Sequence, residues 1–515
     1  MKNRIIIQTK HLPVLLLVIS AIFICSLCLI SNKSETQTED IDNLIARSED
    51  NSIKLEWKNP KINKNEQIEL VIKTTNSTQK IILEAPQESY LYTDGSHGEL
   101  YWFQIRIKNA EGSLSNGQEI SAMFLDWEQL PNLPLISVET KNGVLPTATY
   151  VDHPENCIGS TAIETDYVSG QFTMMTGSKV SVNSSVEIRI RGNTSAFYEK
   201  KPYKLKLDHA IDLLGRNDPI YKDTEWLLIS ADRFLRTETG FKVAEICGQE
   251  WVPQYLTVNL MINGNWMGCY NLVESVKKSP GRLNIADTGF IVEKDAYWWA
   301  EDTPFIHHIA YNFEQTAYTI KYPDKNISER IGPLEEYLAN YDKSLILHEG
   351  DLLEYIDLDS FATWLLVHDI MDTADSGGSN TFLYKNSLDP NSTADKLKIG
   401  PNWDFDSCFS SNYSTDGNKW SRFHETQMFS TLFSDKRFLQ CYKEKWELVS
   451  PFITQEIEAF LNDYVTKNND ALQKSWDLDS TRWRTGQSSA KEISQVITDR
   501  FSNRTAWLDQ MISLF

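Results

Sequence analysis

The sequence predicts an α+β protein, in which a two-lobed domain follows a membrane anchor and a small β-sandwich domain. Three patterns indicate this fold class. An apolar run fills residues 12–31, short alternating strands fill residues 51–130, and residues 131–515 pass from strand patterns to helix patterns. A strand-rich half followed by a helix-rich half is typical of an α+β unit with two lobes, and the cleft between lobes is a usual place for a ligand.

Length and charge limit the classes of protein that fit. The chain has 515 residues, more than one ordinary core holds, so two or three units are expected. Its net charge of −21 argues against nucleic acid as a partner. The sequence contains no P-loop, dinucleotide-binding, zinc-protease or serine-hydrolase signature, so it gives no support to those chemistries.

The first 33 residues are predicted to be an uncleaved signal anchor. Lys2, Arg4 and Lys10 precede the run "LPVLLLVISAIFICSLCLIS", and a run of about 20 apolar residues can span a bilayer. The basic side chains keep that end in the cytoplasm, so we expect the rest of the chain outside it at the cell membrane, or secreted if the segment is cleaved. Polar and acidic residues 34–50 are expected to be a linker.

Residues 51–130 are predicted to form a β-sandwich-like module. The segments "SIKLEW", "EQIELVIKT", "KIILEA" and "YWFQIRIKN" alternate polar and apolar residues, and turn-forming clusters separate them. Nothing in the module suggests chemistry, so a spacer or interaction role is expected. Five cysteines follow the apolar run without a C-x-x-C pair, which argues against a zinc site or a disulfide-built scaffold.

Residues 131–515 are predicted to form the larger domain, with an N-terminal lobe over residues 131–295 and a C-terminal lobe over residues 296–515. Strand patterns such as "SSVEIRIRG", "YKLKL" and "LTVNLMING" come first. Helix patterns such as "DSFATWLLVHDIMD" and "AKEISQVITDRFSNRTAWLDQMI" follow.

The first candidate site segment is "RIRGNTSAFYEKKPYKLKLD", residues 189–208. A turn of small residues between strands can bring backbone N–H groups against phosphate oxygens. Lys204 and Lys206 lie on one face of the following strand, where a lysine can reach the same phosphates. A plain hairpin with a solvated basic face fits this segment equally well.

The second and third segments carry oxygen ligands. In "HDIMDTADSGGSNTFLYKN", Asp375 and Asn380 have the D-x-x-x-x-N spacing of a phosphotransferase catalytic loop, in which the Asp accepts a hydroxyl proton and the Asn holds a metal ion. In "GPNWDFDSCF", Asp404 and Asp406 flank Phe405, and a magnesium ion shared with Asn380 would relieve their repulsion. Alternatively, the first is a solvated acidic helix and loop, and the second a Trp/Phe-anchored turn with exposed acids.

A fourth segment covers residues 256–298 and contains two strand-ending glutamates. Glu274 is expected near the junction of the lobes, and Glu293 ends another strand. Either side chain could pair with a lysine or contact a nucleotide base, and either could be a surface carboxylate.

In their order and in the residues of their motifs, these segments resemble the CotH kinase family, the spore coat protein H-like atypical protein kinases. The resemblance covers residues 130–450 and includes "RIRGNTS", "KKPYKLKLD", "DRFLRTETGFKVAEI", "GFIVEKDA" and "GPNWDFDS". It implies a protein-kinase-like fold that transfers phosphate from ATP to Ser/Thr of secreted or surface proteins. The sequence departs from the family at Arg236-Thr237, where family members usually have "RN". It also shows no evident glutamate to pair with the strand lysine, and our candidate for that partner is Glu245.

The resemblance also implies roles for single residues. Arg191, Gly192, Asn193 and Ser195 would lie in the phosphate-covering turn, Lys206 would contact the ATP phosphates with Lys204 as the second choice, and Glu274 would lie by the adenine-binding connection. Asp375 would be the catalytic base, and Asn380, Asp404 and Asp406 would bind magnesium.

Two other functions fit the sequence. Fifteen tryptophans and paired carboxylates suit a carbohydrate-active enzyme of the glycoside hydrolase type. A catalytically silent kinase fold used for surface binding is the other alternative, although such a module needs neither Asp375 nor Asp404.

Overall fold

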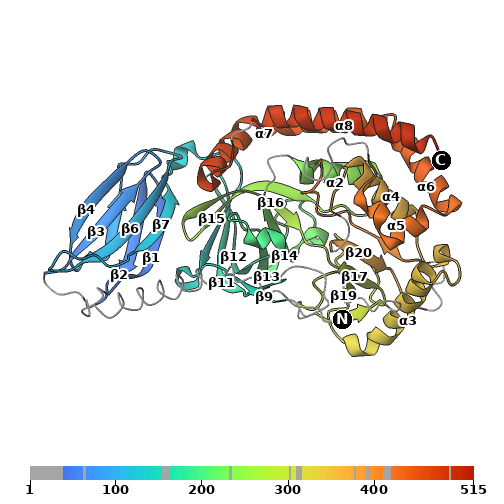
Figure 1. The fold of residues 1–515 in the computed structure, drawn as a ribbon, viewed down its shortest axis with the longest axis horizontal. Coiled ribbons are helices and arrows are strands. Elements are labelled where there is room, and N and C mark those ends of the chain that lie inside the picture. The colour runs from blue at the N-terminus through green and yellow to red at the C-terminus, as the bar shows by residue number, and fades with distance from the viewer. Residues whose placement is uncertain are drawn as a thin grey trace, which may run out of the picture. The chain divides into compact units, whose positions relative to one another are not determined.

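The computed structural model describes most of the chain after residue 38 (Figure 1). The described residues are 39–61, 65–152, 162–177, 179–230, 235–300, 303–308, 316–375, 379–389, 395–409, 419–486 and 489–515. They divide into two compact units. The first contains Ile53–Thr93, Tyr101–Ala122 and the described part of residues 1–46, and the second contains Arg47–Ser52, Asp94–Leu100 and Met123–Phe515.

The first unit consists of two small antiparallel sheets. One has the order β1-β2-β5 and the other β4-β3-β6-β7. Tyr92 of β5 packs its ring 5.8 Å from that of Phe103 of β6, so the sheets share one apolar core. The strands are β1 (Asp42–Glu49), β2 (Ser52–Lys58), β3 (Gln67–Lys73), β4 (Thr78–Glu84), β5 (Ser89–Tyr92), β6 (Leu100–Lys108) and β7 (Gln118–Met123).

The polar segment before residue 51 differs from the expectation of a linker, because β1 occupies Asp42–Glu49. Its polar composition hides a half-buried strand, in which Ala46 and Ser48 are buried and the residues beside Ala46 are half-buried. The predicted anchor, residues 1–33, lies outside the described residues. Among the helices that are described, none combines the length and the apolar character that crossing a membrane requires.

The second unit begins with a closed seven-stranded barrel of order β11-β12-β13-β14-β16-β15-β8. Neighbouring strands are antiparallel except β15 and β8, whose parallel pairing closes the barrel. The strands are β8 (Leu135–Thr140), β11 (Val168–Thr176), β12 (Lys179–Ile190), β13 (Tyr203–Ile211), β14 (Asp223–Ser230), β15 (Tyr255–Ile262) and β16 (Asn265–Glu274). A separate hairpin pairs β9 (Ala148–Val151) with β10 (Ala162–Thr165).

Strict alternation gives the barrel two different faces. Ile188 and Ile190 of β12, with Leu205 of β13 and Leu228 of β14, fill the interior. The residues between them therefore point outward. On β14 and β16 the outward residues Leu227 and Val273 belong to the large core shared with the helices, whereas the outward residues in the segment where β12 pairs with β13 are charged.

A five-stranded sheet of order β18-β19-β17-β20-β21 forms the centre of the C-terminal half. Its strands are β17 (Phe290–Asp295), β18 (Phe305–His307), β19 (Ala317–Tyr322), β20 (Thr381–Lys385) and β21 (Lys398–Ile399). Residues 290–295, which the sequence places in the first lobe, thus pair with β19 and β20. The change from barrel to second sheet occurs between Glu274 and Phe290.

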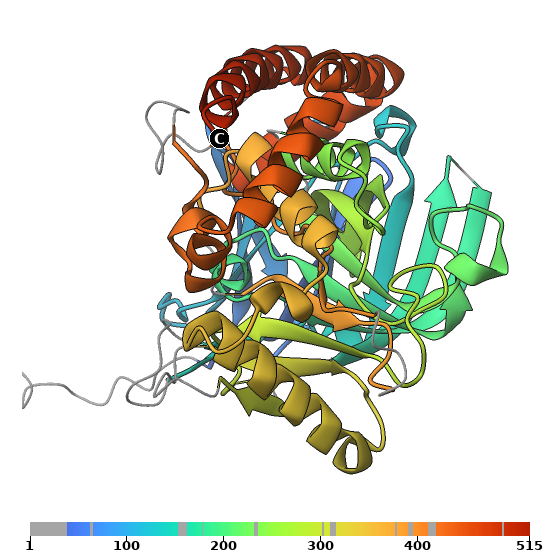
Figure 2. The same ribbon diagram turned by 90° about the vertical axis from the view of Figure 1, so that its right-hand side faces the viewer.

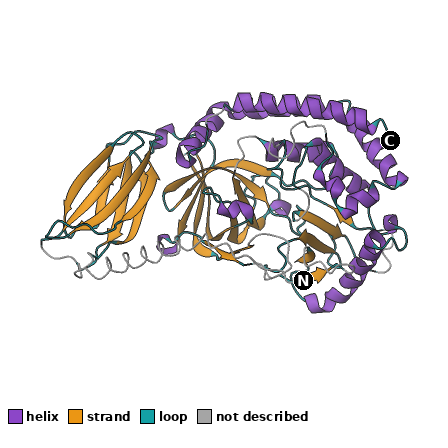
Figure 3. Cartoon of the chain, in the orientation of Figure 1, coloured by secondary structure: helices purple, strands orange, loops and turns teal. Residues whose placement is uncertain are grey.

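Helices make up most of the remaining C-terminal half, as the α+β prediction requires (Figure 3). Helix α2 (Arg236–Ile246) lies between β14 and β15 of the barrel, and the helices that follow are α3 (Ile327–Ile346), α4 (Leu358–Ile370), α5 (Gln427–Leu432), α6 (Lys436–Val449), α7 (Ile453–Trp483) and α8 (Ala490–Ile512). The long helices α7 and α8 pack antiparallel, since Thr454 contacts Thr505 and Gln473 contacts Ala490 (Figure 2, red). Contacts of α7 with the outward face of β15, such as Tyr464 with Thr257, attach this pair to the barrel.

Helix α4 is central to the C-terminal half, because Phe361–Ile370 are all buried. Its Asp369 carboxylate accepts hydrogen bonds from the backbone N–H of Ser421 at 3.0 Å and the Tyr442 hydroxyl at 2.7 Å, and it pairs with His424 Nε2 at 2.8 Å. Burial alone would raise the pKa of Asp369, but attraction to His424 and Arg504 lowers it. The acidic helix is therefore a buried support and not a solvated surface.

We expect Asp369→Ala to destabilise the second unit by about 3–5 kcal/mol, because it leaves buried donors and a buried cation without their acceptor. Urea unfolding followed by tryptophan fluorescence measures the change. Asp463→Ala, which removes only an exposed pair with Lys467 on α7, is the matched control and should leave the midpoint unchanged. Equal midpoints for the two variants would show that the Asp369 contacts do not stabilise the fold.

Candidate functional site

The loop after β21 and the residue before β20 meet in direct contact. Asn380 Nδ2 donates to Asp404 Oδ2 at 2.8 Å. Both residues have left-handed backbones, with φ of 62° and 60°, a conformation that Asn and Asp tolerate better than most residues. The two segments that the sequence singled out for oxygen ligands therefore lie side by side.

Aromatic packing fixes the acidic turn. Trp403 and Phe405 both pack against Phe241 of α2, with ring centroids 6.0 Å and 5.8 Å away. The alternation in "WDFD" places Asp404 and Asp406 on the other side, where Asp406 lies near enough to raise the pKa of Asp404. A Cβ at Gly240 would lie 2.3 Å from Phe405 Cγ, so only glycine allows α2 to approach this closely.

Asn380 is held from a second direction by β17. Its backbone N–H donates to Glu293 Oε1 at 2.8 Å, and Glu293 also pairs with Lys321 of β19 at 3.1 Å. Among the roles that the sequence allowed for Glu293, namely pairing with a lysine, contact with a nucleotide base and a surface carboxylate, the structure shows the pairing with a lysine. By accepting from the Asn380 N–H, Glu293 also orients Asn380 toward Asp404.

The cluster concentrates negative charge around one carboxyl group. Burial, then the neighbouring Asp406 and finally Asp375, raise the pKa of Asp404 to about 8, and Arg191 partly opposes them. Burial lowers the pKa of Arg191, and its attraction to Asp404 and Glu293 acts in the other direction. Arg191 thus provides positive charge to the cluster from the end of β12.

A row of cations continues from Arg191 along the outward face of the barrel. Arg189 and Arg191 follow the outward alternation of β12, and Arg189 is registered against Lys204 of β13. Lys204 forms an ion pair with Glu225 of β14 at 2.9 Å. Burial lowers the pKa of Lys204, Glu225 opposes this, and nearby Arg189 lowers it further. The partner glutamate that the sequence did not reveal is therefore Glu225.

Lys206, the sequence-based first choice for phosphate contact, lies farther from the acidic cluster. It is registered against Glu187, pairs with that residue at 3.7 Å, and is 51% exposed. Two residues along a strand span about 7 Å, so Lys204 lies about 7 Å nearer than Lys206 to the loop at Arg191.

The turn between β12 and β13 has the compact form expected from its small residues. Gly192 has φ of 84°, and a Cβ there would lie 2.3 Å from Ser195 Oγ. Asn193 O accepts from the N–H of Ala196 in a short 3-10 turn, Thr194–Phe197. The turn thus projects from the strand ends that carry Arg191 and Lys204.

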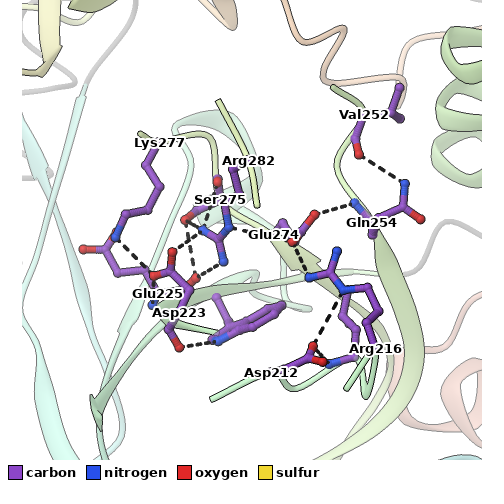
Figure 4. Close-up of polar contacts among 12 residues, drawn as sticks. Asp212, Arg216, Asp223, Glu225, Val252, Gln254, Glu274, Ser275, Lys277 and Arg282 are labelled. Carbon is purple, nitrogen blue, oxygen red and sulfur yellow. Dashed lines mark hydrogen bonds and ion pairs between the residues drawn. The ribbon is translucent and has the colours of Figure 1, made fainter. Parts of the chain in front are cut away.

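Two other predicted residues lie apart from the cluster. Glu274 is fully buried, accepts from Arg216 Nη2 at 2.6 Å and from the backbone N–H of Gln254 at 3.0 Å, and faces inward beside Trp226 (Figure 4). The inward face is opposite to that of Lys204. Glu245 pairs with Lys242 on its own helix at 3.2 Å and contacts neither strand lysine.

Comparison with protein families settles the relationship of the chain. The family model described as CotH kinase protein matches residues 188–508, which include every residue of the cluster. The chain belongs to the CotH kinase protein family. The resemblance inferred from the motifs is therefore confirmed, and the protein is an atypical kinase-like protein. No curated protein matches it significantly.

Similarities to solved structures are distant and carry no further inference. The FN3 domain of human collagen XX matches at 13% identity over 18% of this chain and 99% of that one, with a TM-score of 0.16. The twitchin kinase region from C. elegans matches at 12% identity over 47% and 40%, with a TM-score of 0.18. A structure of titin kinase and its flanking domains matches at 8% identity over 46% and 37%, with a TM-score of 0.16.

The acidic cluster of this CotH kinase family member has the kind of side chains that bind a magnesium ion. Within the described residues, no three or more His, Cys, Asp or Glu side chains are grouped so as to hold a metal by themselves. The groups that do meet are the carboxyl groups of Asp404 and Asp406 and the amide of Asn380, which donates to Asp404 through Nδ2 and offers Oδ1 as its hard oxygen donor. Magnesium is commonly bound by only one or two carboxylates together with phosphate and water, so the donor set fits this ion.

We expect the stability of this CotH kinase family member to depend on the ionisation of Asp404. An unfolded aspartate loses its proton near pH 3.8, whereas folded Asp404 keeps it until about pH 8. The folded state therefore binds more protons between these values, so its free energy of unfolding decreases as pH rises from about 4 to about 8. Asp404→Asn removes this loss and should be more stable than the parent at about pH 8, with a much smaller difference at about pH 4.

Thermal melts in EDTA at the two pH values measure this effect. Asp499→Asn, on the exposed side of α8, controls for the loss of one negative charge and should melt as the parent does at both. A stability difference for Asp404→Asn that does not grow with pH would contradict the raised pKa.

Proposed function

We propose that the protein is a phosphotransferase that moves the γ-phosphate of ATP to serine or threonine hydroxyls of other proteins, with Mg²⁺ as cofactor. The observation that carries the proposal is the 2.8 Å contact between Asn380 and Asp404. Asp375 lies near enough to raise the pKa of Asp404. A metal-binding amide and carboxylate beside an aspartate base are the groups that kinases bring together.

Asp375 is suited to the role of base. Its side chain is exposed, and its backbone N–H donates to Ser407 Oγ at 3.1 Å, which ties it to the loop that carries Asp406. In the proposed step the substrate oxygen forms a bond to the γ-phosphorus, the bond from that phosphorus to ADP breaks, and the hydroxyl proton passes to Asp375. Fixing Asp375 against the second loop favours this step through positioning.

Asn380, Asp404 and Asp406 would hold Mg²⁺, which when bound neutralises phosphate charge. Arg191, Arg189 and Lys204 would contribute fixed positive charge to the triphosphate from the outward face of the barrel. Because Glu225 and Glu293 already balance these cations, the barrel can keep them charged and close together before a nucleotide arrives.

The substrate and the location are the less direct parts of the proposal. We propose secreted or surface proteins as substrates, because the apolar run at residues 12–31 and its basic flank would place the domain outside the cytoplasm. The N-terminal sandwich would then act as a spacer or interaction module.

A glycoside hydrolase is less well supported. Its two carboxyl groups must stand about 5–9.5 Å apart across the sugar. Asp404 and Asp406 instead stand two residues apart in one turn, near enough that Asp406 raises the pKa of Asp404. A silent binding module differs from an active kinase in that the parent chain transfers no phosphate, which the first experiment below measures.

We expect Asp375→Asn to lower the rate of phosphate transfer by about 10²–10⁴-fold, because the amide cannot accept the hydroxyl proton. Transfer from labelled ATP, with mass spectrometry of the product, also distinguishes phosphate from AMP. The melting temperature and the affinity for ATP–Mg²⁺ should remain those of the parent. Parental transfer rates in the variant would reject Asp375 as the base, and no transfer by the parent would favour the silent module.

Lys204→Met and Lys206→Met form a matched pair on one face of β13. We expect only the first to reduce kcat/KM for ATP strongly, by about 10²-fold, because Lys204 lies beside Arg189 and nearer to the acidic cluster. Steady-state kinetics with varied ATP measures both. A larger loss in Lys206→Met would reverse the assignment.

A further inference from the structure

A lysine joins the turn between β12 and β13 to the last turns of helix α7. The turn covers residues 191–202, and we call it the phosphate-covering turn, because the proposed function places it over the ATP phosphates. Lys200 Nζ donates to Asp479 Oδ1 of α7 at 2.7 Å and to the backbone carbonyl of Cys269 at 2.7 Å. The Lys200 side chain is 12% exposed and that of Asp479 is 6% exposed. The ion pair is therefore enclosed, unlike the surface pairs that contribute little to a fold.

The end of α7 is held against the barrel by contacts of its own. Asp479 Oδ1 also accepts from the backbone N–H of Cys269 at 2.9 Å. A Cβ at Gly268, whose φ is 109°, would lie 1.9 Å from that oxygen, so only glycine allows the helix to approach β16 this closely. Trp483 Nε1, one helical turn further on, donates to the carbonyl of the residue before Gly268 at 3.0 Å. These contacts with β16 fix Asp479 independently of Lys200.

The residue after Lys200 carries the attachment into the turn. Lys201 Nζ donates to the carbonyl of Ala196 at 2.8 Å. The hydroxyl of Tyr270, which is buried in the barrel, donates to the Lys201 carbonyl at 2.9 Å. Holding Lys200 and Lys201 in place therefore also holds the short 3-10 segment that contains Ala196.

A second pair of opposite charges faces across the same gap. Burial lowers the pKa of Arg482 of α7, and attraction to Glu199 of the turn acts in the other direction. Arg482 Nε donates to the carbonyl of Trp266 at the start of β16, at 3.3 Å. Glu199 and Lys200 thus lie near residues of opposite charge on α7, and this alternation favours one approach of the turn to the helix.

The partner helix of α7 holds the segments on either side of the acidic cluster. Arg500 of α8 donates to the carbonyl of Phe409, in the loop after β21. Arg504 Nε donates to the Asp369 carbonyl at 2.6 Å, and Arg504 also lies 3.7 Å from Asp372 in the segment that leads to the predicted base. Since α7 and α8 pack along each other, the helix pair contacts both the phosphate-covering turn and the loops of the cluster.

We propose that Lys200 and Asp479 are positioning residues, through which the α7–α8 pair holds the phosphate-covering turn in a fixed place relative to the acidic cluster. The inference rests on the proposed function, because it concerns the turn over the nucleotide phosphates. Neither side chain touches the nucleotide in this scheme. The ion pair acts by limiting the motion of the turn, whose backbone N–H groups would face the phosphates.

Steady-state kinetics with varied ATP tests this role in Lys200→Met, Asp479→Asn and the double variant. We expect each to raise KM for ATP by about tenfold, because a turn that moves positions the phosphates less well. Simple loss of folded enzyme would lower the maximal rate and leave KM unchanged. Since the two residues form one contact, the double variant should raise KM no more than the larger of the two single effects.

The matched control is Asp470→Asn, the same chemical change on the same helix. Asp470 pairs with Lys474 at 3.0 Å on the exposed side of α7. We expect this variant to keep the parental KM, because an exposed pair within one helix does not restrain the turn.

Amide hydrogen exchange of the nucleotide-free chain separates this proposal from the proposed function. The N–H groups of Ala196 and Tyr198 donate to carbonyls within the turn. We expect both to exchange at least about tenfold faster in Lys200→Met and at the parental rate in Asp470→Asn. The measurement needs no nucleotide, so a parent chain without phosphate transfer would refute the kinase function while the exchange rates still decide the role of Lys200.

Parental exchange rates in a folded Lys200→Met variant would overturn the proposal. A parental KM in an active Lys200→Met variant would also overturn it. If a single variant does not fold, the double variant decides by the same two measurements, because it leaves neither charge enclosed without its partner.

Discussion

The concentration of carboxyl groups around Asp404 is the constraint on which the C-terminal half depends. Burial disfavours its charged form, and repulsion from Asp406 and Asp375 adds to this, so the pKa of Asp404 rises to about 8. The protein offsets this with Arg191 and with the amide of Asn380, which Glu293 orients. An arrangement that only a bound cation would fully relieve is typical of a functional site and not of a stabilising one.

The barrel accounts for the opposite, basic side of the site. A strand can bury one face and expose the other only if its residues alternate, and β12 and β13 do so where they pair, over residues 186–190 and 203–207. The same alternation that fills the interior with Ile188 and Leu205 therefore forces Arg189 and Lys204 outward onto neighbouring positions. The cation row is in this sense a consequence of the packing of the barrel core.

Local patterns in the sequence predicted much of this architecture. They could not predict which residues pair across long distances in the chain. Period-two alternation identified most of the barrel strands, and the spacing of Asp375, Asn380 and Asp404 indicated a shared site, two of whose members are in direct contact. The preference for Lys206 over Lys204 was not supported by the geometry, because register against β12 is set by tertiary contacts. The pairing of Lys204 with Glu225 and the closure of the barrel by β8 and β15 are likewise contacts between distant residues.

Glu274 shows why a residue can be recognised as important and still be given the wrong kind of role. It ends β16, where the chain leaves the barrel for the second sheet, and this position suggested contact with a ligand. Its carboxylate is instead enclosed by Arg216 and lies 3.9 Å from Arg282, and Arg282 donates to Ser275 O at 3.0 Å just beyond the strand (Figure 4). A buried carboxylate with two guanidinium neighbours is costly to disturb, so these contacts fix the direction in which the chain departs. Glu274 therefore supports the chain at the point where it leaves the barrel for the second sheet, which carries Glu293.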